Sequence, residues 1–109
     1  MASPQTENGF TKIANELFEA FIRISRFLTC YEISMWLAIL RKTYGFNKKE
    51  DWISLVQLEK LTGIRQCHLS RTKKLLLEKN MIINFKNKLA IQKDYEKWRM
   101  SSLQMTRSK

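Results

Sequence analysis

Polar and basic residues recur along one side of the segment between residues 65 and 74. The face predicted at helical spacing consists of Cys67, Ser70, Arg71 and Lys74. If this helix lies in the major groove of DNA, the guanidinium of Arg71 can donate two hydrogen bonds to guanine O6 and N7, and the side-chain amide of Gln66 can hydrogen-bond to adenine. The predicted base-contacting residues are Arg65, Gln66, Cys67, Ser70 and Arg71.

Positive charge surrounds this face. Between Lys60 and Lys93 the sequence holds nine Lys and Arg residues and the single acid Glu78. The whole chain of 109 residues carries a net charge of +10, and such an excess predicts a polyanionic partner, with nucleic acid as the first candidate. Backbone phosphates are the expected targets of Ser54, Lys73, Lys74, Lys86 and Lys88, where Ser54 contributes through the N–H groups of the helix that it begins.

Two short helices are predicted to position these side chains. Ser54 and Gln57 form a capping box for a helix beginning at Leu55, whose expected buried residues are Leu55, Leu58 and Leu61. Gly63 can take the positive φ of a sharp turn, and a second helix follows over about 66–79 with Leu69, Thr72 and Leu76 on its inner side. This is the pattern of a helix-turn-helix; the alternative is a helical corner with solvated charges.

A small sheet is predicted after the second helix. The β-prone runs 81–85 and 89–91 flank Lys86-Asn87-Lys88, where Asn87 can adopt a positive φ in a hairpin turn. Asn80 replaces the usual glycine at the end of the helix. Together with a short strand at Trp52-Ile53, the hairpin is predicted to make a three-stranded antiparallel wing. Its basic tip is expected to lie beside the second helix, over about 66–79, which is the recognition helix of the motif.

The residues before Ser54 are predicted to form two further helices. The first is expected over about 12–26, with Thr11 as its cap and an apolar face formed by Ile13, Leu17, Phe21 and Ile24. Phe18 and Ile22 lie on a second face, which either packs in the core or contacts a second copy of the chain. Thr29 and Glu32 form a capping box for the second, an apolar central helix that Gly45 is expected to stop in the left-handed conformation.

The fold class is therefore mainly α with a small β-wing (α+β), a winged helix-turn-helix. Residues 1–10 are expected to be a flexible arm, residues 11–99 the folded domain, and residues 100–109 a disordered tail. At the end of the domain, a closing turn is expected to place Tyr95 and Trp98 on the core. Cys30 and Cys67 are too few for a disulfide framework, and Cys67 beside His68 lacks an orienting acid. No enzyme activity, cofactor or metal is expected, nor a membrane partner, and the chain should be cytosolic.

The segments ENGFTKIANELFEAF, LAILRKTYGFNKKEDWISL and QKDYEKW resemble the N-terminal domain of the phage replication protein O family. The resemblance implies a winged-helix domain that binds repeated origin sites of a phage or prophage in the bacterial host, as a homodimer, to initiate DNA replication. Members of that family are longer and have a C-terminal region that recruits the helicase loader, so loader recruitment stays open for a chain that stops soon after the wing. Arg65 departs from the Ser or Thr that often caps a recognition helix, so a weaker cap is expected.

Two other functions use the same residues. A winged-helix transcriptional regulator would bind a promoter instead of an origin, and a basic interaction module would dock an acidic replisome partner. For Arg71 the alternative to a base contact is a surface ion pair with Glu78 or Glu59.

Overall fold

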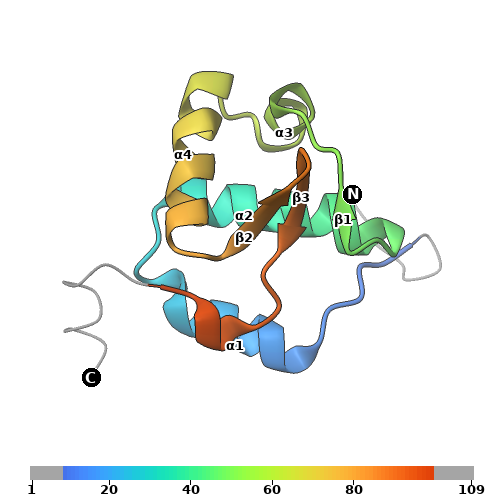
Figure 1. Ribbon diagram of the computed structural model, residues 1–109, viewed down its shortest axis with the longest axis vertical. Helices are drawn as coiled ribbons and strands as arrows, with labels where there is room; N and C mark the ends of the chain where they lie inside the picture. Colours follow the sequence, from blue (N-terminus) through green and yellow to red (C-terminus); the bar gives the residue numbers. More distant parts are fainter. Residues whose placement is uncertain (1–8, 100–109) are drawn as a thin grey trace, which may run out of the picture.

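Four α-helices and a three-stranded sheet form the part of the chain that the structure, a computed structural model, describes, residues 9–99 (Figure 1). In chain order the elements are α1 (Asn15–Ser25), α2 (Cys30–Thr43), the 3-10 turn η2 (Tyr44–Phe46), β1 (Glu50–Asp51), α3 (Leu55–Thr62), α4 (Gln66–Glu78), β2 (Ile82–Phe85), β3 (Lys88–Ile91) and the 3-10 turn η3 (Tyr95–Lys97). From α2 onwards this is the order of a winged helix-turn-helix, so the predicted fold class is confirmed.

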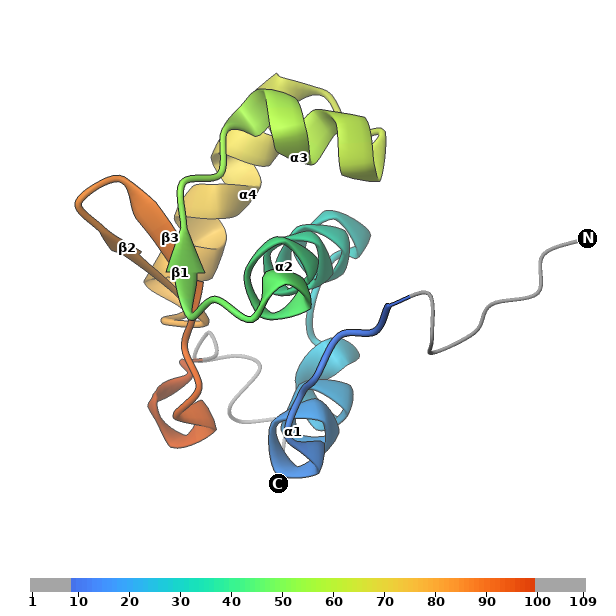
Figure 2. The ribbon, with the colours of Figure 1, turned by 90° about the vertical axis from the view of Figure 1, so that its right-hand side faces the viewer.

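Helix α2 lies at the centre of the molecule, with α3 and α4 on one side and α1 on the other (Figures 1 and 2). Thr29 and Glu32 form the predicted capping box at its start. Its side chains Met35, Trp36 and Ile39 are fully buried. Because α2 is apolar on most of its circumference, its neighbours must cover it from several directions, which makes it the core helix that the sequence predicts.

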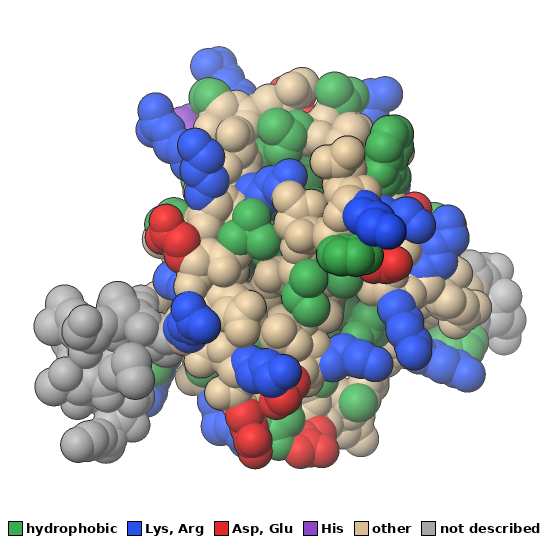
Figure 3. Space-filling model, viewed as in Figure 1, with side chains coloured by type: hydrophobic (Ala, Val, Ile, Leu, Met, Phe, Trp, Pro, Cys, Tyr) green, Lys and Arg blue, Asp and Glu red, His purple; other side chains and the backbone are tan. Residues whose placement is uncertain are grey.

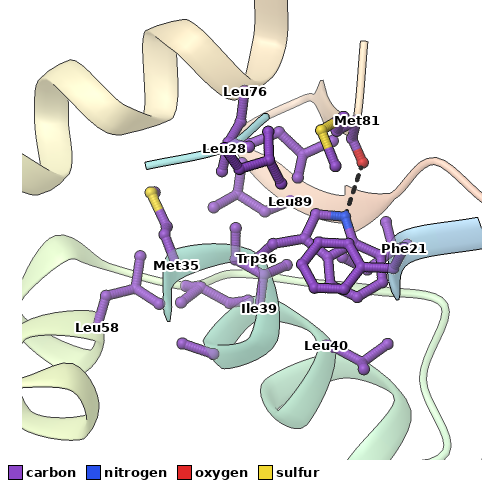
Figure 4. Packing of buried hydrophobic residues seen from close by; sticks show 14 of the residues in the cluster. Phe21, Leu28, Met35, Trp36, Ile39, Leu40, Leu58, Leu76, Met81 and Leu89 are labelled. Atoms are coloured by element: carbon purple, nitrogen blue, oxygen red, sulfur yellow. Dashed lines mark hydrogen bonds between the residues drawn. The ribbon is translucent and has the colours of Figure 1, made fainter. Parts of the chain in front are cut away.

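Trp36 connects three of these neighbours (Figure 4). Its ring stacks on Phe21 of α1 with centroids 4.0 Å apart, and it meets Trp98 edge-on at 6.0 Å. Its indole N–H donates to the carbonyl oxygen of Met81, at the entrance to β2, over 3.3 Å. One buried side chain thus fixes α1, the start of the wing and the C-terminal turn against α2, and the expected place of Trp98 on the core is confirmed.

The turn and strand signals place the remaining elements. Gly63 has a φ of 77° and ends α3, and Asn80 has a φ of 57° at the end of α4, as predicted. Lys86 and Asn87, with φ of 50° and 65°, form a two-residue hairpin turn of the type that suits twisted antiparallel strands. The sheet order is β1-β3-β2, and Ile82, Leu89 and Ile91 point into the core.

Four predicted features are wrong. The first helix begins at Asn15 with Ala14 as its cap, not at Lys12 under Thr11. Gly45 does not stop α2; the left-handed residue is Asn47, with a φ of 58°, after one turn of 3-10 helix. The two regions lie close together, since a Cβ on Gly45 would be 3.2 Å from the Thr11 hydroxyl.

The other two errors lie near β1 and in α3. The edge strand is Glu50–Asp51, paired with Ala90 and Leu89, and Trp52-Ile53 follow it. Leu61 is 48% exposed, because α3 has only eight residues and packs on the core mainly through Leu58. Of the predicted terminal segments, 1–8 and 100–109 lie outside the described residues, and the domain bounds 11–99 stay a prediction.

A buried ion pair joins α2 to the end of α4. Lys79 Nζ lies 2.7 Å from Glu32 Oε2, and the two side chains are only 16% and 2% exposed. The other oxygen of Glu32 accepts the backbone N–H of Thr29 at 2.9 Å. Glu32 is therefore satisfied on both oxygens, one by the helix cap and one by a cation from another helix.

Glu32→Gln should lower the free energy of unfolding by about 3 kcal/mol, the low end of the cost of breaking a buried ion pair, because Lys79 keeps some access to water. Glutamine preserves the capping box, so the loss reports the ion pair. Urea denaturation measures it. The matched control is Lys97→Gln, which removes the exposed pair with Asp94 at 4.0 Å and should not measurably change stability. Equal effects of the two substitutions would contradict this role of Glu32.

Candidate nucleic-acid interface

Helix α4 presents the predicted polar and basic face to solvent. Leu69, Thr72 and Leu76 are 0%, 3% and 0% exposed, which fixes the rotation of the helix about its axis. The opposite side then carries Cys67, Arg71 and Lys74, which are exposed, whereas Ser70 and Lys73 lie nearer to the buried stripe and are half-buried. The spacing of the buried stripe thus determines that Arg71 and Lys74 point away from the protein.

The start of α4 differs in detail from a well-capped helix. Arg65 occupies the N-cap in an extended conformation and its side chain caps no N–H group, as expected for arginine at this position. Its guanidinium is exposed. Arg65 therefore adds a positive charge at the point where the turn meets the exposed face of α4.

Gln66, the predicted adenine-reading residue, is engaged within the protein. Its side-chain N–H donates to Glu59 Oε1 of α3 over 2.9 Å. The bond is exposed, so water competes with it and its net free energy is small. Gln66 would have to leave Glu59 before it could contact a base.

Neither alternative role of the neighbouring residues is seen. Within residues 9–99 the ion pairs are Lys48–Asp51, Lys79–Glu32 and Lys97–Asp94, so Arg71 forms none with Glu78 or Glu59. His68 packs against Tyr31 of α2 with ring centroids 5.2 Å apart, pointing away from the exposed side of Cys67. No three His, Cys, Asp or Glu side chains in this part of the chain are arranged to hold a metal ion.

Ser54 and the wing complete the surface. The Ser54 hydroxyl accepts the N–H of Gln57 and the Gln57 side chain accepts the N–H of Ser54, both at 3.2 Å, which confirms the capping box and leaves the next N–H groups of α3 pointing outwards. Asn87 at the hairpin turn lines the same surface pocket as Ser54, so the wing tip lies beside the start of α3. Lys86 and Lys88 flank this turn and are exposed.

Lys and Arg side chains are spread over the face shown in Figure 3, including α4 and the side that holds β1, and the acidic side chains are most numerous at the end of α1 and η3. At that end the hydroxyl of Tyr95 donates to the carboxylate of Glu16, and this bond raises the pKa of Tyr95 above its usual value. A polyanion would therefore approach from the side of α4 and the wing.

Sequence reasoning missed two exposed aromatic residues near the wing. Trp52 is 67% exposed and Phe85 is 58% exposed. The exposure of Phe85 could have been predicted from the alternation of side chains along a strand. If Ile82 faces the core, the third residue after it, Phe85, faces outwards. Trp52 was assigned to a strand, and its exposure depends on where β1 ends.

The helix-turn-helix, the basic outer side of α4 and the hairpin beside it define a winged helix-turn-helix protein. The chain belongs to the bacteriophage replication protein O family, whose profile matches residues 3–98.

The curated relatives are also phage replication proteins. The chain is 32% identical over 95 residues to DNA replication protein gp18 of Salmonella phage P22, covering 87% of this chain and 34% of that protein. It is 38% identical over 82 residues to Replication protein 15 of Enterobacteria phage phi80, covering 72% and 26%, and 36% identical over 76 residues to Replication protein O of Escherichia phage lambda, covering 70% and 22%. The chain thus spans at most about a third of the length of these relatives. No solved structure matches it.

Proposed function

We propose that the chain binds double-stranded DNA sequence-specifically at a phage or prophage replication origin and so initiates DNA replication. The observation that carries the proposal is that Arg71 and Lys74 are exposed on a helix whose opposite side is buried in the core. The chain also belongs to a phage replication family. α4 enters the major groove, with Arg71 and the residues before it near base edges. Lys73, Lys74, Lys86, Lys88 and the first turn of α3 contact phosphates.

Two further parts of the proposal concern where the chain acts and what it does not need. Its place of action is the cytoplasm of the bacterial host, on the nucleoid, because the relatives replicate phage DNA. No helix within residues 9–99 is long and apolar enough to cross a bilayer. Binding to DNA by these side chains requires neither a cofactor nor a catalytic group.

The bound form is proposed to be a homodimer that pairs through α1. Phe18 and Ile22 are 46% and 56% exposed on this helix, and Leu75 of α4 is 43% exposed, whereas Leu77 packs against the core. Helix α1 lies at the end of the molecule remote from α3 in both ribbon views, so pairing there leaves α4 and the wing free (Figures 1 and 2). Sedimentation of the saturated complex should give two chains per symmetric site; one chain per site would refute the dimer.

Footprinting on the DNA around the chain's own gene should reveal protected repeats in an origin. Affinity for such a repeat should fall with salt with a log–log slope of about −4 to −5, as expected when about four to six phosphates are neutralised. A slope near zero would refute the electrostatic part of the proposal. Protection of a promoter instead of an origin would indicate a transcriptional regulator.

Arg71 and Lys88 should differ in what they contribute. Arg71→Ala should cost about 1–3 kcal/mol of binding free energy on the protected repeat and much less on a scrambled duplex, because the lost contact is to a base edge. Lys88→Ala should weaken both duplexes alike and make the salt slope shallower by about 1, because its partner is a phosphate.

Competition binding with the two duplexes measures both effects. The matched control is Lys97→Ala, which removes the same charge from the remote turn η3 and should change the affinity least. Equal losses on repeat and scrambled duplex for Arg71→Ala would show that the recognition face has been assigned wrongly.

A further inference from the structure

The outer face of the wing carries an unusual combination of side chains at its tip. Phe85 of β2 pairs with Lys88 of β3. β1 pairs with β3 through Glu50 and Asp51, and Trp52, the residue after this strand, lines a surface pocket together with Asn87 of the hairpin turn. Leu89 faces the core at 2% exposure, so its neighbour Lys88 faces outwards. Trp52, Lys88 and Phe85 therefore all lie near the hairpin turn, and these three residues are here called the aromatic row.

The two aromatic side chains of this row do not contribute to the core. Trp52 is 67% exposed and Phe85 is 58% exposed, whereas Trp36 is fully buried and Trp98 packs against the core. Within residues 9–99, Trp52 makes no stacking or edge contact with another ring. Large apolar rings held in water at the end of a hairpin lower solubility, which favours a role in binding.

Lysines lie in the hairpin that holds Phe85. Lys86 Nζ lies 5.3 Å from the centroid of the Phe85 ring, and Lys88 is the residue of β3 that pairs with Phe85. On the other side, Trp52 lines a surface pocket of about 360 Å³ with Ser54, Gln57 and Asn87, which opens at the first turn of α3. Exposed rings beside lysines and amides suit a ligand that has both flat apolar faces and negative charge.

Unpaired DNA has this chemistry. Trp52 and Phe85 each offer an exposed ring on which a base can stack, and Lys86 and Lys88 lie in the hairpin, where they can contact phosphates of the same strand. Bases of a closed duplex are stacked on one another and offer no free face to a ring. A protein partner that recognised these rings would meet Lys86 and Lys88 as well, so the charge favours the nucleic acid.

We propose that the aromatic row binds single-stranded DNA by stacking unpaired bases on Trp52 and Phe85. This inference rests on the proposed function and extends it: α4 holds the duplex site while the wing tip captures a strand that opens next to it. The duplex contacts come from α4 and the lysines, and the single-strand contacts come from the row, so the two activities depend on different side chains.

The test uses the whole chain and fluorescein-labelled oligo(dT) of about 16 nucleotides, the upper range of site sizes for one small single-strand-binding domain. Binding followed by anisotropy should be accompanied by quenching of tryptophan emission, since Trp52 is the only one of the three tryptophans that is largely exposed. Trp52→Ala and Phe85→Ala should each weaken oligo(dT) binding about tenfold. Trp52→Phe should retain most of the affinity, and circular dichroism verifies that each variant is folded.

The footprinted duplex repeat provides the second arm. Trp52→Ala should leave its affinity nearly unchanged, whereas Arg71→Ala should weaken the repeat and leave oligo(dT) binding nearly unchanged. Three results would overturn the inference: no oligo(dT) binding, oligo(dT) binding that Trp52→Ala and Phe85→Ala do not weaken, or equal weakening of duplex and single strand by Trp52→Ala. If the unsubstituted protein does not bind the duplex repeat, that separate result would refute the proposed function.

Discussion

The structure depends on the burial of α2 from several sides. A helix with Met35, Trp36 and Ile39 at or near zero exposure cannot be stable in isolation, since its apolar surface exceeds what one neighbour can cover. α1, the helix-turn-helix and the sheet each cover one side of α2. Trp36 contacts the first through Phe21 and the last through the Met81 carbonyl, so the positions of elements far apart in the sequence are coupled through one side chain.

The exposed surface follows from the same constraint. Each element that covers α2 gives its apolar side to the core and leaves its other side free, and those free sides differ. α4 leaves arginine and lysine, α1 leaves Phe18 and Ile22, and the hairpin leaves Phe85 beside Lys88. A domain of this size can therefore expose a basic helix face, an apolar helix face and a basic aromatic edge without any of them weakening its core.

The elements that the sequence predicted correctly are those with local physical causes. Capping boxes at Thr29 and Ser54, the positive φ of Gly63, Asn80 and Asn87, and the buried stripe of α4 all depend on residues within a few positions of one another. The candidate contact residues on α4 belong to the same group, because their exposure is the complement of that stripe. Such features arise from backbone sterics and helix periodicity, which act before any tertiary contact forms.

The features that the sequence predicted wrongly depend on distant segments. Thr11 caps no helix and lies instead beside Gly45, a residue far along the chain, and β1 is the segment that pairs with β3, Glu50–Asp51. The engagement of Gln66 by Glu59 and of Glu32 by Lys79 likewise joins separate helices.

By itself, the sequence determined the helix-turn-helix, the hairpin, the positive charge and the family resemblance. Only the tertiary structure decided which side chains meet, since Phe85 and Lys88 come from two strands and acquire a common face through the register of the sheet. Register is a property of paired strands, and no single strand contains it.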